Sequence, residues 1–206
     1  MEEAIERVLT RLHAEMEREN ELRHILSKEE WDSRRPDLML AIGESAGRFI
    51  NFLIKSTRST RVLEVGTSVG YSTVWLAEAA RATGGRVVSL DINPAKQALA
   101  AQNLEAAGLR SFVELIADDA LTTLGSLTAE FDFVLLDAER AQHVDIFNAF
   151  HPKVLPGGIV VTDNITFPKP EESRPYLEQI RNHPDYAVSM LLEIENGLEL
   201  SLKRSV

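Results

Sequence analysis

Apolar residues recur three or four positions apart along the beginning of the chain, with charged residues between them. This spacing is typical of a helix with one apolar face. It predicts an amphipathic helix over residues 3 to about 24, packed against a neighbouring element or a second subunit. The apolar positions are Ile5, Val8, Leu9, Leu12 and Met16.

A polar segment over residues 27–36 follows, and the helical spacing then returns just ahead of a short apolar run. The second set of apolar positions is Ala46, Phe49, Ile50, Leu53 and Ile54. Beyond it, short apolar runs alternate with longer amphipathic segments, which predicts alternating strands and helices. The expected strands cover 61–65, 86–91, 111–116, 131–136 and 157–162, and the expected helices cover 70–82, 94–107, 119–126, 143–151 and 171–182.

Strands that alternate with helices pair in parallel, because each crossover helix returns the chain to the same end of the sheet. The alternation therefore predicts an α/β fold with a doubly wound, Rossmann-like, mostly parallel sheet and helices on both faces. Near the end of the chain, Asn196 and Gly197 lie between two further apolar runs, 187–194 and 198–202. Asn-Gly between such runs is a strong hairpin signal, so we expect an antiparallel C-terminal hairpin at the edge of the sheet.

The chain has 206 residues, 44% of them hydrophobic, which suits one domain over residues 1–206 with an N-terminal helical extension at about 1–37. It has no cysteine, which excludes disulfides, thiolate nucleophiles and soft metal sites. No apolar run approaches the ~20 residues of a membrane helix, and the acidic N-terminus lacks the apolar core of an export signal. We therefore expect a soluble, cytoplasmic protein with no membrane partner. The net charge of -10 disfavours nucleic acid as a partner.

Residues 61–72 carry the most informative chemistry, since they combine a buried strand, a glycine turn and the start of a helix. Such a turn presents backbone amides to a nucleoside cofactor. The dinucleotide fingerprint has a glycine two residues after the first, but this chain has Ser68 between Gly66 and Gly70. A cofactor without a pyrophosphate fits better, and S-adenosylmethionine is the common one. NAD is the second candidate, and a turn without any ligand is the third.

Several side chains near this turn suit the same methyl donor. Glu64 can face its positively charged amino group or sulfonium, and Ser72 can donate to its carboxylate. Asp91 ends the second strand, about 20 residues after the turn, where an acid accepts from both ribose hydroxyls. After the third strand, Asp119 either binds the exocyclic amine of adenine, with the Ala120 amide on a ring nitrogen, or caps the next helix.

The fourth and fifth predicted strands end in further oxygen-bearing side chains, Asp137 and the pair Asp163 and Asn164. Because the carboxyl ends of neighbouring parallel strands meet at one edge, we expect these three side chains to lie together. Two carboxylates and an amide oxygen suit Mg2+ first, and Ca2+ or Mn2+, but not Zn2+. A turn cluster without metal is the alternative. A cation beside a methyl donor would bind a substrate hydroxyl and lower its pKa.

With these residues in order, the chain resembles the cation-dependent class I O-methyltransferases, the family of catechol and caffeoyl-CoA O-methyltransferases, over roughly residues 38–203. Segment 39–43 with Gly47 is similar to the family segment that folds over the cofactor. The resemblance implies a seven-stranded sheet with an antiparallel last strand, and a homodimer. It implies donor contacts from Ile42, Glu64, Gly66, Thr67, Ser68, Gly70, Ser72, Asp91, Asp119, Ala120 and Asp137, and metal contacts from Asp137, Asp163 and Asn164.

The chain departs from the family at Arg140, which stands three residues after Asp137 where a lysine is generally regarded as the base. Arginine keeps its proton. His143 replaces a common tyrosine, and a neutral imidazole accepts a proton near pH 7. Either the cation alone acidifies the hydroxyl while Arg140 orients a substrate anion, or His143 is the base. The alternative for His143 is a solvent-exposed residue at a helix start. The catalytic candidates are Asp137, Arg140 and His143.

The resulting hypothesis is a metal-dependent O-methyltransferase that uses S-adenosylmethionine and acts on a small hydroxylated substrate, catechol-like or phenolic. Its alternatives are methylation of a tRNA hydroxyuridine by the same family, a non-catalytic donor-binding module and a nicotinamide oxidoreductase. Arg34, Arg35 and Lys169 flank the expected substrate entrance, either attracting an acidic substrate or as solvated charges. Trp31 and Met39 either cover a planar substrate or pack against a neighbour.

Overall fold

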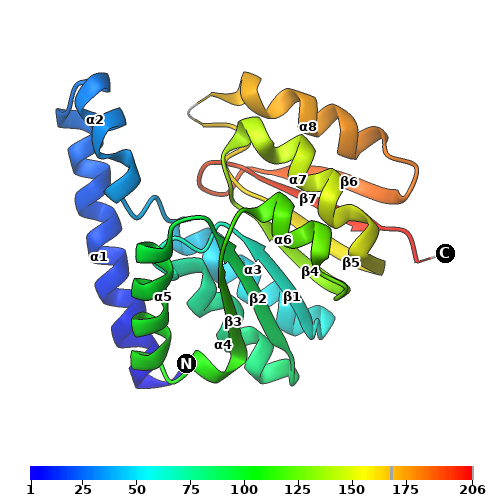
Figure 1. Cartoon of the computed structure of the whole chain (residues 1–206), viewed down its shortest axis with the longest axis horizontal. Coiled ribbons are helices and arrows are strands. Elements are labelled where there is room, and N and C mark those ends of the chain that lie inside the picture. The colour runs from blue at the N-terminus through cyan, green and yellow to red at the C-terminus, as the bar shows by residue number, and fades with distance from the viewer. Residues whose placement is uncertain (168, 206) are drawn as a thin grey trace.

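Seven strands form a single sheet with helices on both faces (Figure 1), in a computed structural model that describes residues 1–167 and 169–205. The spatial order is β3-β2-β1-β4-β5-β7-β6. The strands are β1 (Arg61–Val65), β2 (Arg86–Asp91), β3 (Val113–Ala117), β4 (Phe131–Leu136), β5 (Val154–Thr162), β6 (Tyr186–Leu192) and β7 (Leu198–Lys203).

The pairs among β1 to β5 are parallel, and β7 runs antiparallel to both of its neighbours. The predicted doubly wound α/β fold with an antiparallel C-terminal hairpin is confirmed. The last strand in sequence, β7, lies inside the sheet beside β5, and β6 forms the edge. Strand β5 begins earlier than the predicted 157–162, because Val154 already pairs with Phe131 of β4.

Alternate residues of the central strands face two separate hydrophobic clusters, which is why both faces of the sheet need helices. Val62 packs with residues of α1, α3, α4 and α5 on one face, while Leu63 packs with residues of α6, α7 and α8 on the other. The helices are α1 (Glu3–Ile25), α2 (Lys28–Arg34), α3 (Glu44–Thr57), α4 (Tyr71–Thr83), α5 (Pro94–Ala106), α6 (Ala120–Ser126), α7 (His143–Phe150) and α8 (Pro170–Asn182).

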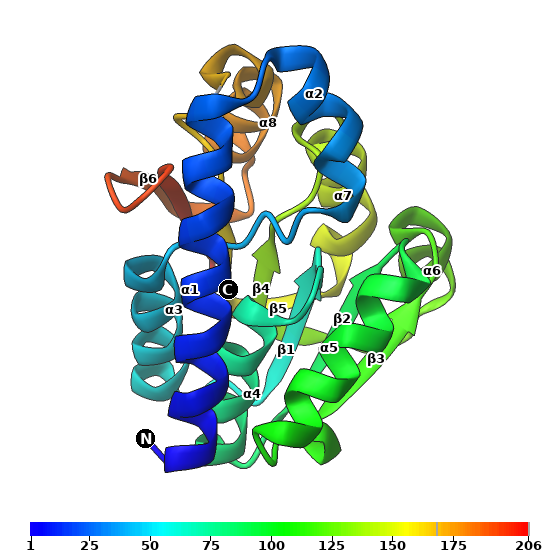
Figure 2. The same ribbon diagram turned by 90° about the vertical axis from the view of Figure 1, so that its left-hand side faces the viewer.

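Helix α1 corresponds to the amphipathic helix predicted over residues 3 to about 24, and its five predicted apolar positions are all buried. Its neighbours are α4 and α5 of the same chain. Figure 2 shows α1 running the length of the molecule, with α2 on the side toward which the strand arrowheads point. None of the helices in the described part of the chain is both long and apolar enough to cross a membrane.

The polar segment 27–36, for which the apolar spacing predicted no helix of its own, contains the helix α2. Ser27 and Glu30 form a capping box: the Glu30 amide donates to Ser27 Oγ at 3.2 Å, and the Ser27 amide donates to Glu30 Oε2 at 2.9 Å. The sequence pattern for this cap, a serine with glutamate three residues later, was present. The apolar spacing did not indicate α2, because this helix has no buried residue and therefore no apolar face.

The turn after β1 lies directly against the end of β4. Gly66 has a φ of +108°, and a Cβ placed on it would lie 1.8 Å from the carbonyl oxygen of Asp137. The Asp137 amide in turn donates to the Val65 carbonyl at 2.8 Å. Because only glycine allows both this backbone conformation and this approach, Gly66 sets how closely the β1 and β4 loops pack.

We predict that Gly66→Ala destabilises the fold by about 3 kcal/mol, since it adds both a positive-φ penalty and a backbone clash. Gly84→Ala is the matched control, because Gly84 has a φ of +78° but no atom within 4 Å of an added Cβ. Gly84→Ala should lower the free energy of unfolding by about 1 kcal/mol. Urea unfolding of the three proteins measures both values. Equal losses in the two variants would contradict the proposed packing constraint.

Candidate functional site

The carboxyl ends of β1, β2, β4 and β5 meet at one edge of the sheet, as expected for parallel strands. At this edge Gly66, Ser68 and Gly70 all have positive φ, at +108°, +46° and +88°. The Ser68 amide donates to Asp91 Oδ2 at 2.7 Å, and the Asn93 amide donates to Asp91 Oδ1 at 2.8 Å. The glycine turn therefore fixes Asp91, whose oxygens each retain an acceptor position for a further donor.

Glu64 lies inside the protein rather than at its surface. Its carboxylate is fully buried and accepts from the hydroxyls of Ser72, Thr73 and Ser89 at 2.5 to 2.6 Å. Burial raises the pKa of Glu64, and the three hydroxyl donors partly offset that rise. The Ser72 hydroxyl, predicted to donate to a cofactor carboxylate, donates to Glu64 instead. A direct contact of Glu64 with the methyl donor stays a prediction.

Polar contacts with α1, α5 and the glycine turn hold the segment between α2 and α3 in place. The Met39 amide donates to Glu19 of α1 at 2.7 Å, and Lys96 of α5 donates to the Leu38 carbonyl at 2.7 Å. The Ser68 hydroxyl donates to the Met39 carbonyl at 2.5 Å. The segment that the resemblance implies to fold over the cofactor thus lies against the glycine turn, and its contact with a cofactor stays a prediction.

Three further predicted donor contacts remain predictions. Ile42 lies in this segment and is 2% exposed. Asp119 caps α6, since its Oδ1 accepts from the Thr122 amide at 2.9 Å, which confirms the capping alternative. Its second oxygen and the Ala120 amide are the groups that the adenine hypothesis requires.

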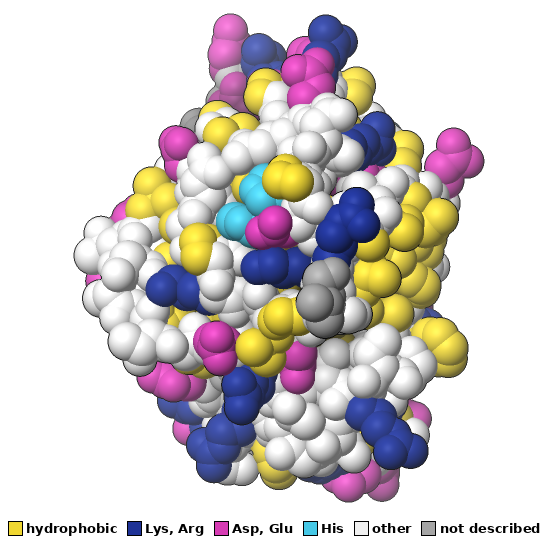
Figure 3. Space-filling model, turned by 90° about the vertical axis from the view of Figure 1, so that its right-hand side faces the viewer, with side chains coloured by type: hydrophobic (Ala, Val, Ile, Leu, Met, Phe, Trp, Pro, Cys, Tyr) yellow, Lys and Arg dark blue, Asp and Glu magenta, His cyan; other side chains and the backbone are white. Residues whose placement is uncertain are grey.

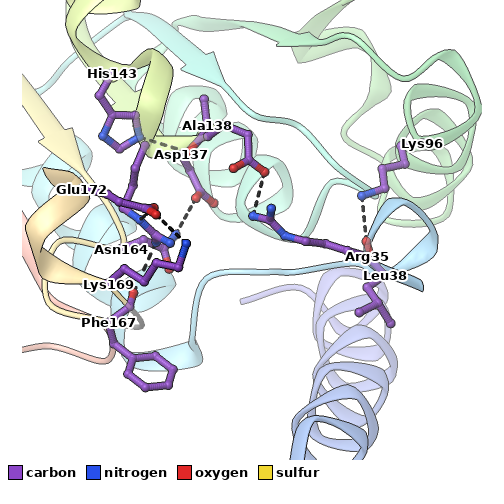
Figure 4. A network of polar contacts seen from close by, with 12 residues as sticks. Arg35, Leu38, Lys96, Asp137, Ala138, His143, Asn164, Phe167, Lys169 and Glu172 are labelled. Carbon is purple, nitrogen blue, oxygen red and sulfur yellow. Dashed lines mark hydrogen bonds and ion pairs between the residues drawn. The ribbon is translucent and has the colours of Figure 1, made fainter. Parts of the chain in front are cut away.

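The three predicted metal ligands lie together at the ends of β4 and β5, and Figure 4 shows two of them, Asp137 and Asn164. The Asn164 side-chain amide donates to Asp137 Oδ1 at 2.9 Å and to Asp163 Oδ2 at 3.1 Å. Asn164 has a φ of +62°, a left-handed conformation that asparagine tolerates. The second oxygen of Asp163, Oδ1, is buried and has no hydrogen-bond partner in the described chain. Rotation of the Asn164 side-chain amide by half a turn would place its oxygen, instead of its nitrogen, next to the two carboxylates.

The electrostatics of this trio favour a cation. Burial raises the pKa of Asp137 well above its usual range, and the charges of Asp163 and Glu64 add to that rise. Burial likewise raises the pKa of Asp163 to about 6. The positive charge of Arg140 opposes both shifts. The buried Asp163, which has an unpartnered oxygen, and the partly buried Asp137 form a donor set that a hard divalent ion satisfies, so the residues present fit the predicted metal.

Arg140 lies beside the trio but is held by other groups. Its Nε donates to Glu172 Oε2 at 3.3 Å, and its Nη1 donates to the Phe167 carbonyl at 3.4 Å. Figure 4 shows the chain that these contacts form with Lys169, from the loop after β5 to the start of α8. Arg140 is thus positioned over the predicted cation ligands as a fixed positive charge.

His143 is not the exposed helix-start residue that one alternative described, because its side chain is fully buried. The ring stacks edge-on against Tyr176 at 5.6 Å, and Nε2 lies 3.0 Å from the Ala138 carbonyl oxygen. Burial lowers the pKa of His143 to about 4. The structure contradicts His143 as the substrate's base, because packing by α8 leaves neither nitrogen open to a substrate.

A second group of possible metal ligands lies away from this edge, where Figure 3 shows histidine beside an acidic side chain. Ligand atoms of His151, His183 and Asp185 lie within 4.8 Å of one another. Only part of this group has partners: His151 Nε2 is 3.5 Å from Asp185 Oδ2, and His183 Nδ1 accepts from the Asp185 amide at 3.2 Å, whereas His151 Nδ1 is buried with no hydrogen-bond partner among the described residues. Sequence analysis missed this group because its members follow α7 and α8, which meet only in the fold.

Comparison with known proteins agrees with the resemblance read from the motifs. A family model described as O-methyltransferase matches residues 13–174. A catechol O-methyltransferase of Niastella koreensis is 31% identical over 130 residues, which are 61% of this chain and 58% of that protein. A catechol O-methyltransferase of Mycobacterium tuberculosis is 35% identical over 127 residues, 61% of this chain and 57% of that protein. The chain therefore matches less than two thirds of the length of these relatives.

A solved structure supports the same relationship over nearly the whole chain. It is the O-methyltransferase TomG of Streptomyces achromogenes, involved in tomaymycin synthesis and determined in complex with S-adenosylmethionine. Its TM-score is 0.75 at 26% identity, and the alignment covers 99% of this chain and 91% of TomG.

We predict that the buried His143 makes the fold sensitive to acid. The unfolded chain binds a proton at this histidine near pH 6.5 and the folded chain only near pH 4, so stability rises with pH across that window and is lost as pH falls. The full effect is about 3 kcal/mol. His143→Gln should remove this part of the difference in unfolding free energy between pH 7 and pH 4.5, measured in urea. His24→Gln, at an exposed position, should leave it unchanged; equal pH profiles for wild type and His143→Gln would contradict the assignment.

Proposed function

We propose, from the premise that this chain belongs to the O-methyltransferase family, that it transfers a methyl group from S-adenosylmethionine to a hydroxyl of a small aromatic acceptor. The proposal includes a divalent cation held by Asp137, Asp163 and Asn164. One observation carries it: the three oxygen-bearing side chains converge at the same sheet edge as the glycine turn and Asp91. In the overall reaction the sulfonium becomes a thioether, and the hydroxyl loses its proton as the oxygen gains the methyl group.

The glycine turn and Asp91 are the proposed donor-binding elements. Asp91 is already oriented by the amides of Ser68 and Asn93, so ribose hydroxyls would meet a fixed acceptor. The side chain of Ser68 occupies the position where a dinucleotide fingerprint has glycine, which favours a donor without a pyrophosphate. TomG, which aligns with 99% of this chain, was solved with S-adenosylmethionine, and this supports the same donor here.

The acceptor hydroxyl is proposed to lie between the donor and the acid–amide trio. A bound divalent cation would supply Lewis-acid stabilisation of the developing oxyanion, which lowers the hydroxyl's pKa. Arg140 keeps its proton and His143 is buried, so the proposal assigns no protein base and the proton leaves to water. Arg140 contributes a fixed positive charge next to the reacting oxygen. The names of the relatives favour a catechol-type acceptor with adjacent hydroxyls.

We predict that the purified chain forms S-adenosylhomocysteine from S-adenosylmethionine when catechol and Mg2+ are present. A chelator should abolish turnover, and Mg2+ or Mn2+ should restore it. Chromatography of S-adenosylhomocysteine against time measures both effects. Turnover that persists in excess chelator would overturn the metal-dependent part of the proposal. Binding of S-adenosylhomocysteine without turnover of any adjacent diol would identify a donor-binding protein instead of an enzyme.

Asp163→Asn tests the assigned ligands directly. It should lower kcat/KM by about 100-fold or more, since Lewis-acid stabilisation contributes several kcal/mol. It should also weaken Mn2+ binding measured by electron paramagnetic resonance, a readout that needs no turnover. The double variant His151→Gln, His183→Gln is the matched control, because it removes the other cluster of possible ligands in the described chain. Loss of Mn2+ binding in the control but not in Asp163→Asn would move the cation to that cluster.

A further inference from the structure

Arg23, near the end of α1, lies close to two aromatic rings that come from different parts of the chain. Its guanidinium carbon is 5.3 Å from the ring centre of Trp31 in α2 and 4.7 Å from that of Phe167. Phe167 follows Asn164 in the loop after β5 and is 47% exposed. Arg23 therefore reaches from the N-terminal extension to the loop that carries two of the proposed cation ligands.

Other cations gather around this position. Burial lowers the pKa of Arg23, and the positive charges of Arg140 and Arg35 lower it further, so both lie within electrostatic range. The charge of Arg140 also lowers the pKa values of Asp137 and Asp163. Arg140 is therefore a common neighbour of Arg23 and of the acid–amide trio. Figure 4 shows Arg35 and Phe167 on different sides of Asp137.

Arg35, Arg140 and Lys169 each pair with a carboxylate. Arg23 has no carboxylate partner among the described residues. Arg35 pairs with Glu139 at 2.7 Å. Arg140 and Lys169 share Glu172, at 3.3 Å and 2.5 Å. Within residues 1–167 and 169–205, no carboxylate lies within 4.0 Å of Arg23, and its guanidinium donates no hydrogen bond.

A partly buried guanidinium that is repelled by two other cations and has unused N–H groups is a site for an anion. Both rings lie close to the guanidinium carbon, and the N–H edge is the part suited to a ligand, since that edge matches the paired oxygens of a carboxylate or phosphate. The flanking rings of Trp31 and Phe167 suit a planar aromatic body beside the anion. Arg34 and Lys169, singled out in the sequence, are less suited, because Arg34 is exposed and Lys169 is paired.

We propose that the methyl acceptor carries an anionic group, a carboxylate or a phosphate, and that Arg23 binds this group while the acceptor's hydroxyl faces the acid–amide trio. The substrate class is then a dihydroxylated aromatic acid or phosphate ester rather than a neutral catechol. This inference rests on the proposed function, which it narrows. Arg23 is a specificity-determining residue in this scheme, and it touches no reacting atom.

The kinetic test compares catechol with 3,4-dihydroxybenzoate and 3,4-dihydroxybenzyl phosphate at saturating S-adenosylmethionine and Mg2+. The anion with the lower KM shows whether the site prefers a carboxylate or a phosphate. Its KM should be at least about 10-fold below that of catechol, which corresponds to the free energy of one charge-assisted contact. Arg23→Gln should raise this KM about 10-fold and leave kcat and the KM of catechol unchanged. Arg23→Lys should recover part of the affinity, and Arg34→Gln, which removes one exposed charge from the adjacent helix, should change nothing.

A binding titration separates failure of this inference from failure of the proposed function. Benzoate and phenyl phosphate, which have no reacting hydroxyl, should alter Trp31 fluorescence in the wild type but not in Arg23→Gln. Trp75, the other tryptophan, is 3% exposed and is common to both proteins. If no acceptor is methylated but the anion titration depends on Arg23, the function proposal fails and the anion site stands. If catechol and the anions are methylated with equal KM in both proteins, or neither anion binds, the anion site is overturned.

Discussion

The close approach of two backbone segments, the turn after β1 and the end of β4, is the constraint on which the rest of the site depends. Gly66 has no side chain, and an added Cβ would meet the Asp137 carbonyl at 1.8 Å. Strand-end hydrogen bonds continue this contact in both directions, from the Gly66 amide to Leu90 at 2.9 Å and from the Asp163 amide to Leu136 at 3.0 Å. The proposed donor-binding turn and the proposed cation ligands are therefore held together by the main chain, whatever ligand is bound.

That arrangement concentrates negative charge in a poorly solvated place. Glu64, Asp137 and Asp163 all have raised pKa values, with burial as the largest cause. Glu64 is stabilised internally by three hydroxyls, whereas Asp163 keeps an oxygen without a partner. Glu64 is therefore a structural acid, whereas Asp137 and Asp163 are suited to bind a ligand. Arg140 offsets part of the charge, and a hard cation would offset the remainder.

The N-terminal extension packs on the helices beside the sheet and contacts the loops at its carboxyl edge. Helix α1 packs on α4 and α5, and its last turns reach the predicted site through Glu19 and Arg23. Arg35, just after α2, pairs with Glu139 in the loop that follows β4. The extension thus contacts both the segment over the glycine turn and the loops that carry the acid–amide trio. Its contribution would be to the acceptor side, where members of one family with a shared core can differ in substrate.

Local sequence pattern determined the alternating fold, the glycine turn and the clustering of Asp137, Asp163 and Asn164. These follow from the period of apolar residues and from the rule that parallel strands end at one edge. Only the tertiary structure decided what each polar side chain meets. Ser72 donates to Glu64, His143 is buried under α8, and Arg23 lies near the rings of Trp31 and Phe167. Periodicity specifies which face of an element is apolar, but the partner of a polar group is set by packing between elements far apart in the chain, which no local pattern encodes.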